Sequence, residues 1–258
     1  MAIPRLLPAL LVAPVLLAAS PRAARAQLAP SEAIARGDSL MAELETRKAI
    51  DAYRAGLERD STNVGLLWKT ARAASNLADW TPGEEGDETR YDEAVRLARR
   101  AVEHGPDISR AHSTLAIALG KLALFRGGKR KVELSRGVKR HAERAIELDP
   151  ADFSPFTVLG AWHREVATLN FFLKTFAETF YGGLPDASLE RSARLLRRAV
   201  ELAPDTITPR LQLARTYVEM DREAAAREQL RRAVSLEPEE RLDVAQKRRA
   251  RELLEELS

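Results

Sequence analysis

The chain has no cysteine among its 258 residues. This absence excludes disulfides, a thiol nucleophile, cysteine-ligated zinc and a lipid-modified N-terminal cysteine. Aromatic residues make up only 5% of the chain, and runs of β-branched residues are absent after the first thirty positions. Alanine, leucine, arginine and glutamate dominate instead, and all of them are good helix formers. The composition therefore predicts an all-α fold.

The chain also lacks an excess of charge once its first segment is set aside. Residues 1–26 contain three arginines and no acid. Removing these three from the 41 basic residues leaves 38, which equals the number of acidic residues, 38. Because a neutral chain has no global positive field to attract a polyanion, we expect no nucleic-acid partner.

Signatures of catalysis and of metal binding are missing as well. The four histidines form no His-Glu-x-x-His pair, and there is no Gly-x-Ser-x-Gly elbow and no Walker loop. We therefore predict that the protein is not an enzyme, with no catalytic residue, no cofactor and no metal site.

The first 26 residues have the three parts of a secretory signal. Arg5 provides a positive start, residues 6–20 are an uncharged apolar run, and Ala24-Arg25-Ala26 is a small-x-small cleavage site. The apolar run of 15 residues is shorter than the roughly 20 residues that a spanning helix needs. We predict a secreted, periplasmic product cleaved near Ala26. The alternative is an uncleaved N-terminal anchor.

Five later segments share one ending, a small residue followed five positions later by proline or, once, by serine. The pairs are Gly56 with Ser61, Ala101 with Pro106, Ala145 with Pro150, Ala199 with Pro204, and Ala233 with Pro238. A small residue lets the second helix of a pair approach its neighbours closely, and proline cannot continue a helix. We therefore expect the four alanines to be buried between helices.

The first helix of each pair has matching offsets. In the segment 207–240, Leu213, Ala214 and Tyr217 occupy the seventh, eighth and eleventh positions. These offsets resemble those of tetratricopeptide repeats, strongly in repeats two to five and more weakly in the first. His163 falls at a position that such repeats give to a packed aromatic, so we expect it in the core.

The resemblance implies an all-α solenoid, a right-handed superhelix of about five helix pairs with a C-terminal capping helix. It implies one domain over 27–258, with repeats near 30–63, 64–108, 109–152, 153–206 and 207–240, and the cap over 241–257.

The repeats are of unequal length. Steps between Ser61 and the four prolines are 45, 44, 54 and 34 residues, against a usual period of about 34. Three repeats therefore carry insertions, which we place at 80–90, 124–136 and 168–185, between the two helices of each pair.

Two of these insertions support a closer resemblance. The segment 127–150, which begins Gly127-Gly-Lys-Arg-Lys-Val-Glu-Leu-Ser, and the segments 159–170 and 179–185 resemble the regulator of microtubule dynamics family. That resemblance covers about residues 35–255 and implies the repeat layout. It also implies microtubule association, which we do not expect of a secreted protein.

A tetratricopeptide stack has a concave face lined by its first helices, and this face is the expected binding groove. Its predicted residues are Trp68, Lys69, Arg72, Asn76, Arg110, Lys121, Arg164 and Arg215. Because this set is basic, we predict a protein or peptide partner that is acidic or ends in a carboxylate. The alternative is a set of solvated charges with acidic partners one turn away on the same helix.

Two other segments leave alternatives open. Phe172, Phe176 and Phe180 recur at every fourth position, which predicts either an extra helix packed back on the stack or an exposed hydrophobic patch for a partner or a membrane surface. The basic run 126–140 is either a patch for an anionic lipid or a polyanion, or the solvated start of a helix.

The sequence thus predicts a non-catalytic interaction scaffold of the cell envelope. The alternative function is membrane-associated assembly or tethering, through an uncleaved signal or the Phe-rich insertion.

The signal can be tested by the intact mass of the exported protein. We expect a mass that lacks residues 1–26, because the small-x-small site at Ala24–Ala26 is accessible to signal peptidase. A mass that retains them would show that the segment is kept as an anchor.

Overall fold

The computed structural model describes residues 28–80, 87–184 and 186–258, and all regular secondary structure in these ranges is α-helical. The helices are α1 (Pro30–Ala42), α2 (Thr46–Arg59), α3 (Val64–Trp80), α4 (Asp87–His104), α5 (Ser109–Arg126), α6 (Gly128–Leu148), α7 (Phe153–Ala167), α8 (Phe171–Tyr181), α9 (Leu189–Leu202), α10 (Ile207–Glu219), α11 (Glu223–Ser235) and α12 (Arg241–Glu256). The predicted signal, residues 1–26, lies outside the described residues. None of the described helices is both long and apolar enough to span a membrane.

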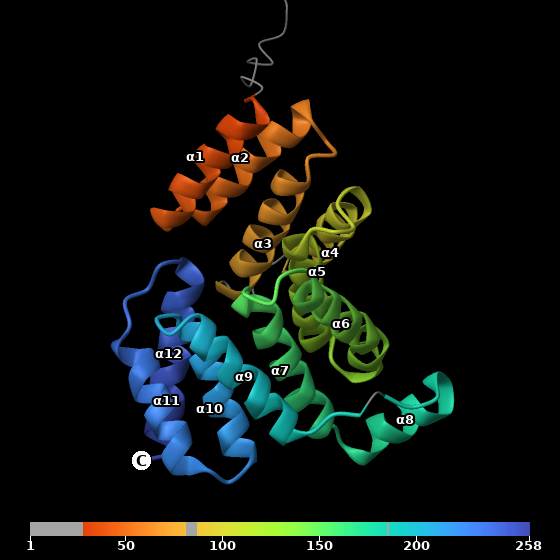
Figure 1. Ribbon diagram of the computed structural model, residues 1–258, viewed down its shortest axis with the longest axis vertical. Coiled ribbons are helices and arrows are strands. Elements are labelled where there is room, and N and C mark those ends of the chain that lie inside the picture. The colour runs from red at the N-terminus through yellow and green to blue at the C-terminus, as the bar shows by residue number, and fades with distance from the viewer. Residues whose placement is uncertain (1–27, 81–86, 185) are drawn as a thin grey trace, which may run out of the picture.

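The helices pack as successive pairs. The pairs are α1 with α2, α3 with α4, α5 with α6, α7 with α9, and α10 with α11, and each lies within one predicted repeat range. Figure 1 shows these pairs stacked into a curved body, with α12 beside α10 and α11. The predicted all-α tetratricopeptide-type solenoid is confirmed.

Small residues lie where the helices approach most closely. Ala101, Ala145, Ala199 and Ala233 are all fully buried, at 0% exposure, as predicted. Gly56 shows how close the contact is, since a Cβ there would be 2.6 Å from the Cβ of Ala33. Larger side chains at such positions would hold the helices apart, so the small residues set the spacing of the stack.

The four prolines follow the ends of α4, α6, α9 and α11 by two or three residues. The next helix begins three residues after each of them, at positions 109, 153, 207 and 241. Because proline has no N–H group to donate, it ends each second helix at the same point of the repeat.

The structure corrects the placement of two insertions. The segment 124–136 is not a connection, because α5 and α6 are separated by Gly127 alone and continue into this range. Gly127 has a φ of 60°, a conformation that glycine adopts without strain. The segment is rich in leucine, lysine and arginine, so helix propagation extends both neighbours. In the segment 80–90, helix α4 already begins at Asp87, and residues 81–86 lie outside the described residues.

The third insertion, 168–185, contains α8. The Asn170 side chain accepts a hydrogen bond from the backbone N–H of Leu173 at 3.0 Å and caps the start of this helix. Gly182, with a φ of 65°, ends it, and the Gly183 N–H donates to the Ala177 carbonyl at 2.9 Å. Among the described helices, α8 packs mainly against α6 and projects from the body at the lower right of Figure 1.

His163 lies in the core, as expected from its repeat position. Its side chain is buried on α7 beside Trp162, with the two ring centroids 4.9 Å apart, and its Nδ1 has no hydrogen-bond partner among the described residues. Burial first, and then the nearby cations Arg191 and Lys139, lower the pKa of His163 to about 4. The imidazole is therefore neutral at neutral pH and acts as a packed ring.

A pair of glycines tests the close-packing requirement. A Cβ at Gly160 would be 2.6 Å from Leu196 Cγ, so Gly160→Ala should lower the free energy of unfolding by about 1–3 kcal/mol. Gly120 is the matched control, because its nearest neighbour would be 3.7 Å away. Gly120→Ala should be neutral or stabilising by up to about 1 kcal/mol. Urea denaturation measures both, and equal stability of the two variants would contradict the argument.

Candidate functional site

The first helices of successive pairs contact one another in the order α1, α3, α5, α7 and α10. They line one face of the stack, where the sequence predicted the groove. The C-terminal helix α12 packs on α10 and α11 and also on α3. The predicted cap therefore does more than cover the last repeat, because it crosses this face and reaches the second repeat.

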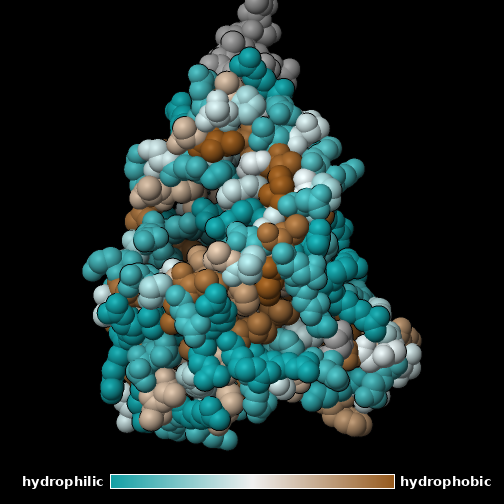
Figure 2. All heavy atoms as spheres, in the orientation of Figure 1, coloured by the Kyte–Doolittle hydropathy of each residue, from teal (hydrophilic) through white to brown (hydrophobic). Residues whose placement is uncertain are grey.

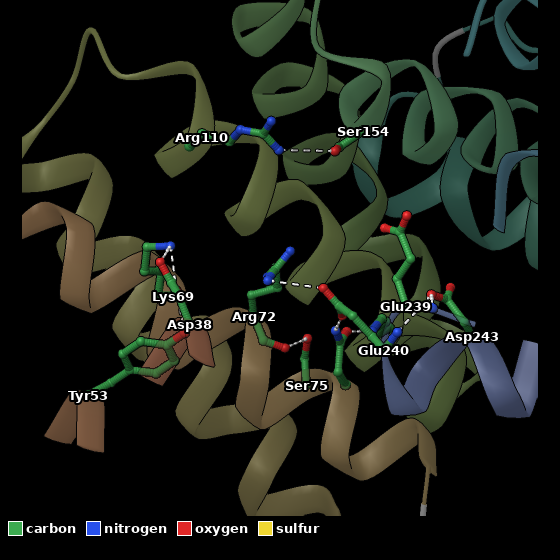
Figure 3. Close-up of polar contacts among 12 residues, drawn as sticks. Asp38, Tyr53, Lys69, Arg72, Ser75, Arg110, Ser154, Glu239, Glu240 and Asp243 are labelled. Carbon is green, nitrogen blue, oxygen red and sulfur yellow. Dashed lines mark hydrogen bonds and ion pairs between the residues drawn. The ribbon is translucent and has the colours of Figure 1, made fainter. Parts of the chain in front are cut away.

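In the N-terminal half of the face, Lys69 forms an ion pair with Asp38. Lys69 Nζ lies 2.8 Å from Asp38 Oδ1, and the Tyr53 hydroxyl donates to the same carboxylate at 2.7 Å (Figure 3). Burial acts to raise the pKa of Asp38, but the hydrogen bonds from Lys69 and Tyr53 hold it below its usual value. Trp68 lies beside this pair, with Lys69 Nζ 4.7 Å from its ring centroid.

The next two predicted residues bind an acid from the far end of the chain. Arg72 Nη2 lies 3.1 Å from Glu240 Oε1, and Asn76 Nδ2 donates to Glu240 Oε2 at 3.1 Å. Glu240 is the residue directly before α12, and Figure 3 shows it reaching toward Arg72 on α3. A carboxylate of the protein itself thus occupies the place that we predicted for an acidic peptide.

A buried network completes this half. Asp79, at the end of α3, accepts from the Tyr91 hydroxyl at 2.6 Å and pairs with Lys121 Nζ at 3.0 Å. Lys121 also donates to Asn76 Oδ1 at 2.9 Å. Burial acts to raise the pKa of Asp79, but the charge of Lys121 and the Tyr91 hydrogen bond lower it overall. Lys121 is thus held by two internal acceptors, Asp79 and Asn76.

Arg110 and Arg164 also have partners within the chain. Arg110 pairs with Asp152 at 3.4 Å and lies 3.4 Å from Ser154 Oγ. Arg164 is buried and donates to the Gln212 carbonyl at 3.1 Å and to Gln212 Oε1 at 2.9 Å.

Most of the basic set is thus engaged within the protein, and the acids and carbonyls that contact it come mostly from other elements rather than from one turn away on the same helix. Arg215 is the exception, because it has no hydrogen bond or ion pair with any described residue. Binding of an acidic partner by this set stays a prediction.

A cavity remains open in the C-terminal half of the face, where α7, α10 and α12 meet. It has a volume of about 430 Å³ and is lined by Arg164, Glu165, Arg215, Glu219, Arg249 and Glu252, among others. Arg249 was not predicted, because nothing local in the sequence shows that α12 turns onto this face. Within the described residues, no group of three or more histidine or acidic side chains is placed to hold a metal ion.

The three phenylalanines predicted as a patch are divided by the structure. Phe172 and Phe180 are 64% and 68% exposed, and the adjacent Phe171 is 83% exposed. Phe176 is partly buried, with its ring centroid 4.9 Å from that of Phe180 and Lys129 Nζ 4.8 Å above it. Brown and tan side chains mark this projection at the lower right of Figure 2. The helix is thus attached to α6 but presents an apolar face outward.

The basic run 126–140 is largely paired inside the molecule. Arg126 binds Glu88 and Asp92 at 3.0 and 2.7 Å, and Lys131 pairs with Glu165. Arg136 donates to the carbonyls of Tyr181 and Gly183 and so fastens the end of α8 to α6. These contacts favour the interpretation of this run as the start of a helix over that of an open lipid-binding patch.

Comparison with known proteins identifies the family. Residues 33–258 match the family model described as regulator of microtubule dynamics protein 1-3. The chain belongs to this family. The mouse regulator of microtubule dynamics protein 1 is 28% identical over 198 residues, which are 76% of this chain and 64% of the mouse protein. The mouse protein 3 is 27% identical over 172 residues, 66% of this chain and 37% of its own length. The chain thus spans between a third and two thirds of the length of these two relatives.

A solved structure supports the fold alone. A thermophilic TPR protein of Thermus thermophilus superposes with a TM-score of 0.63 at 17% identity, covering 88% of this chain and 99% of the other.

The contact between Arg72 and Glu240 can be tested by charge reversal. Arg72→Glu places two carboxylates together between α3 and the start of α12, and Glu240→Arg places two cations there. We expect each single variant to lower the free energy of unfolding by about 1 kcal/mol, and the double variant to recover most of that loss. Urea denaturation of all four proteins gives the coupling energy. A coupling energy near zero would show that this pair does not hold α12 across the face.

Proposed function

We propose that the protein is an exported, non-catalytic scaffold of the cell envelope that binds a protein or peptide on the concave face of its repeat stack. The proposal rests on a difference between the two halves of this face. Its N-terminal half is closed by Glu240 and by the Asp79 network, whereas an open cavity of about 430 Å³ remains between α7, α10 and α12.

Export is the part of the proposal that rests on sequence. Residues 1–26 have the composition of a secretory signal, and a protein outside the cytoplasm would meet no microtubules. We therefore propose that the chain shares its repeat architecture with the animal proteins of its family but not the activity in their name.

The binding site is tested by site-specific photo-crosslinking in the organism that makes the protein. A photoreactive amino acid at Glu219, which is exposed beside the cavity, should yield a discrete crosslinked product. The same amino acid at Arg231, exposed on α11, is the matched control and should not. A product at Arg231 but none at Glu219 would place the partner elsewhere on the molecule.

A second function is favoured by α8. Its exposed Phe171, Phe172 and Phe180 form an apolar face that would insert into the boundary of a bilayer, which suits membrane-associated assembly or tethering. In this case the protein should stay with membranes after a high-salt wash, and Phe172→Ala with Phe180→Ala should release it. Release of the unaltered protein by salt alone would count against this function.

A further inference from the structure

Arg215 is a charged side chain that forms no ion pair with a described residue. It lies on α10, lines the open cavity, and is largely shielded from solvent, yet no described residue accepts a hydrogen bond from its guanidinium. A guanidinium has five N–H donors and keeps its charge under all ordinary conditions. Leaving all five without a protein partner in a partly desolvated position is costly, so an external acceptor would be stabilised here.

The two neighbouring side chains, Arg164 and Arg249, are also cationic and do not neutralise the charge of Arg215. Arg164 and Arg249 line the same cavity. Burial first, and then the charges of Arg164 and Arg249, lower the pKa of Arg215, while Glu165 opposes them only in part. Glu165 is itself engaged, because it pairs with both Lys131 and Arg164. Arg249 has one long contact, 3.5 Å to the Asp79 carbonyl. The inner part of the cavity is therefore positive.

The outer part of the cavity carries negative charge. Glu219, Glu252 and Glu256 line the cavity and are exposed. Glu252 has only a distant partner, Arg248 at 3.8 Å, and neither Glu219 nor Glu256 forms an ion pair with a described residue. A polyanion would be repelled by these carboxylates as it approached. A ligand with a single carboxylate and a nearby ammonium would match both parts.

We propose that this cavity binds the C-terminal carboxylate of a peptide whose last residue is basic. The carboxylate lies on Arg215 and Arg249 in the geometry that guanidinium groups provide for two parallel hydrogen bonds, and the basic side chain lies among Glu219, Glu252 and Glu256. The proposal deepens the proposed function and rests on it, since it assigns the part of the partner that enters the face.

The Glu240 contact gives an internal precedent for this recognition. In the other half of the same face, Arg72 and Asn76 bind one carboxylate through its two oxygens. The protein thus already uses an arginine on a first helix, together with a second polar donor, to hold a carboxylate against the stack. Arg215 occupies a first helix in the same way but forms no ion pair with a carboxylate among the described residues.

The test uses the full chain and N-acetyl-lysine, which carries both a carboxylate and an ammonium. We expect saturable binding by isothermal titration calorimetry or by NMR of the arginine side chains. N-acetyl-lysinamide, which lacks the carboxylate, should bind at least tenfold more weakly. Arg215→Gln should weaken N-acetyl-lysine binding at least tenfold, and Arg231→Gln on α11 is the matched control that should leave it unchanged.

Each other outcome overturns the assignment. Equal binding of the amide would show that no carboxylate is recognised, and tighter binding of inorganic phosphate than of N-acetyl-lysine would show a phosphate site. Absence of binding by every probe would also overturn it. A crosslink from position 219 that persists when Arg215 is replaced by glutamine would reject this site while leaving the scaffold function intact, whereas absence of that crosslink with Arg215 present would reject the function itself.

Discussion

The close approach of helices at small residues is the constraint on which the rest of the structure depends. Four alanines in the second helices have no exposed surface, and Gly56, Gly37 and Gly160 leave no room for a Cβ at its ideal position. Helices that touch at glycine or alanine lie closer than those held apart by leucine. Repeating this contact at regular offsets curves the stack, and the curvature creates a face that the C-terminal helix can cross.

Where α12 crosses this face, it divides the face into a closed part and an open part. Glu240 binds Arg72 and Asn76, and Arg249 reaches the end of α3. Contacts between residues more than 160 positions apart in the chain join the second repeat to the last helix. Repeat stacks are otherwise stabilised mainly by contacts between neighbouring repeats. The contacts of α12 with α3 therefore restrict the relative motion of distant repeats and fix the shape of the remaining cavity.

The two insertions within the described residues have different physical roles. The residues around Gly127 lengthen α5 and α6, and the longer α6 provides the surface against which α8 packs. Arg136 holds the end of α8 by two backbone carbonyls. The apolar face that α8 presents outward is thus held on a fixed support.

The sequence alone determined the repeat. Helix-forming composition, alanines and prolines at constant offsets, and the histidine at an aromatic position all act through local propensity or through contacts between adjacent helices, which recur in every repeat. The positions of Ala101, Ala145, Ala199, Ala233 and His163 followed from these rules.

Tertiary structure decided which charges are available for binding. Eight groove positions could be read from their offsets, but their partners Asp38, Asp79 and Glu240 come from other elements, and Glu240 meets Arg72 only because the whole stack curves back on itself. Ion pairing depends on distances of a few ångströms in three dimensions, which no offset within a single repeat encodes. For this reason the repeat offsets could place Arg215 on the groove face, but its lack of an ion pair with any described residue, and the position of Arg249 in the same cavity, could be recognised only in the folded molecule.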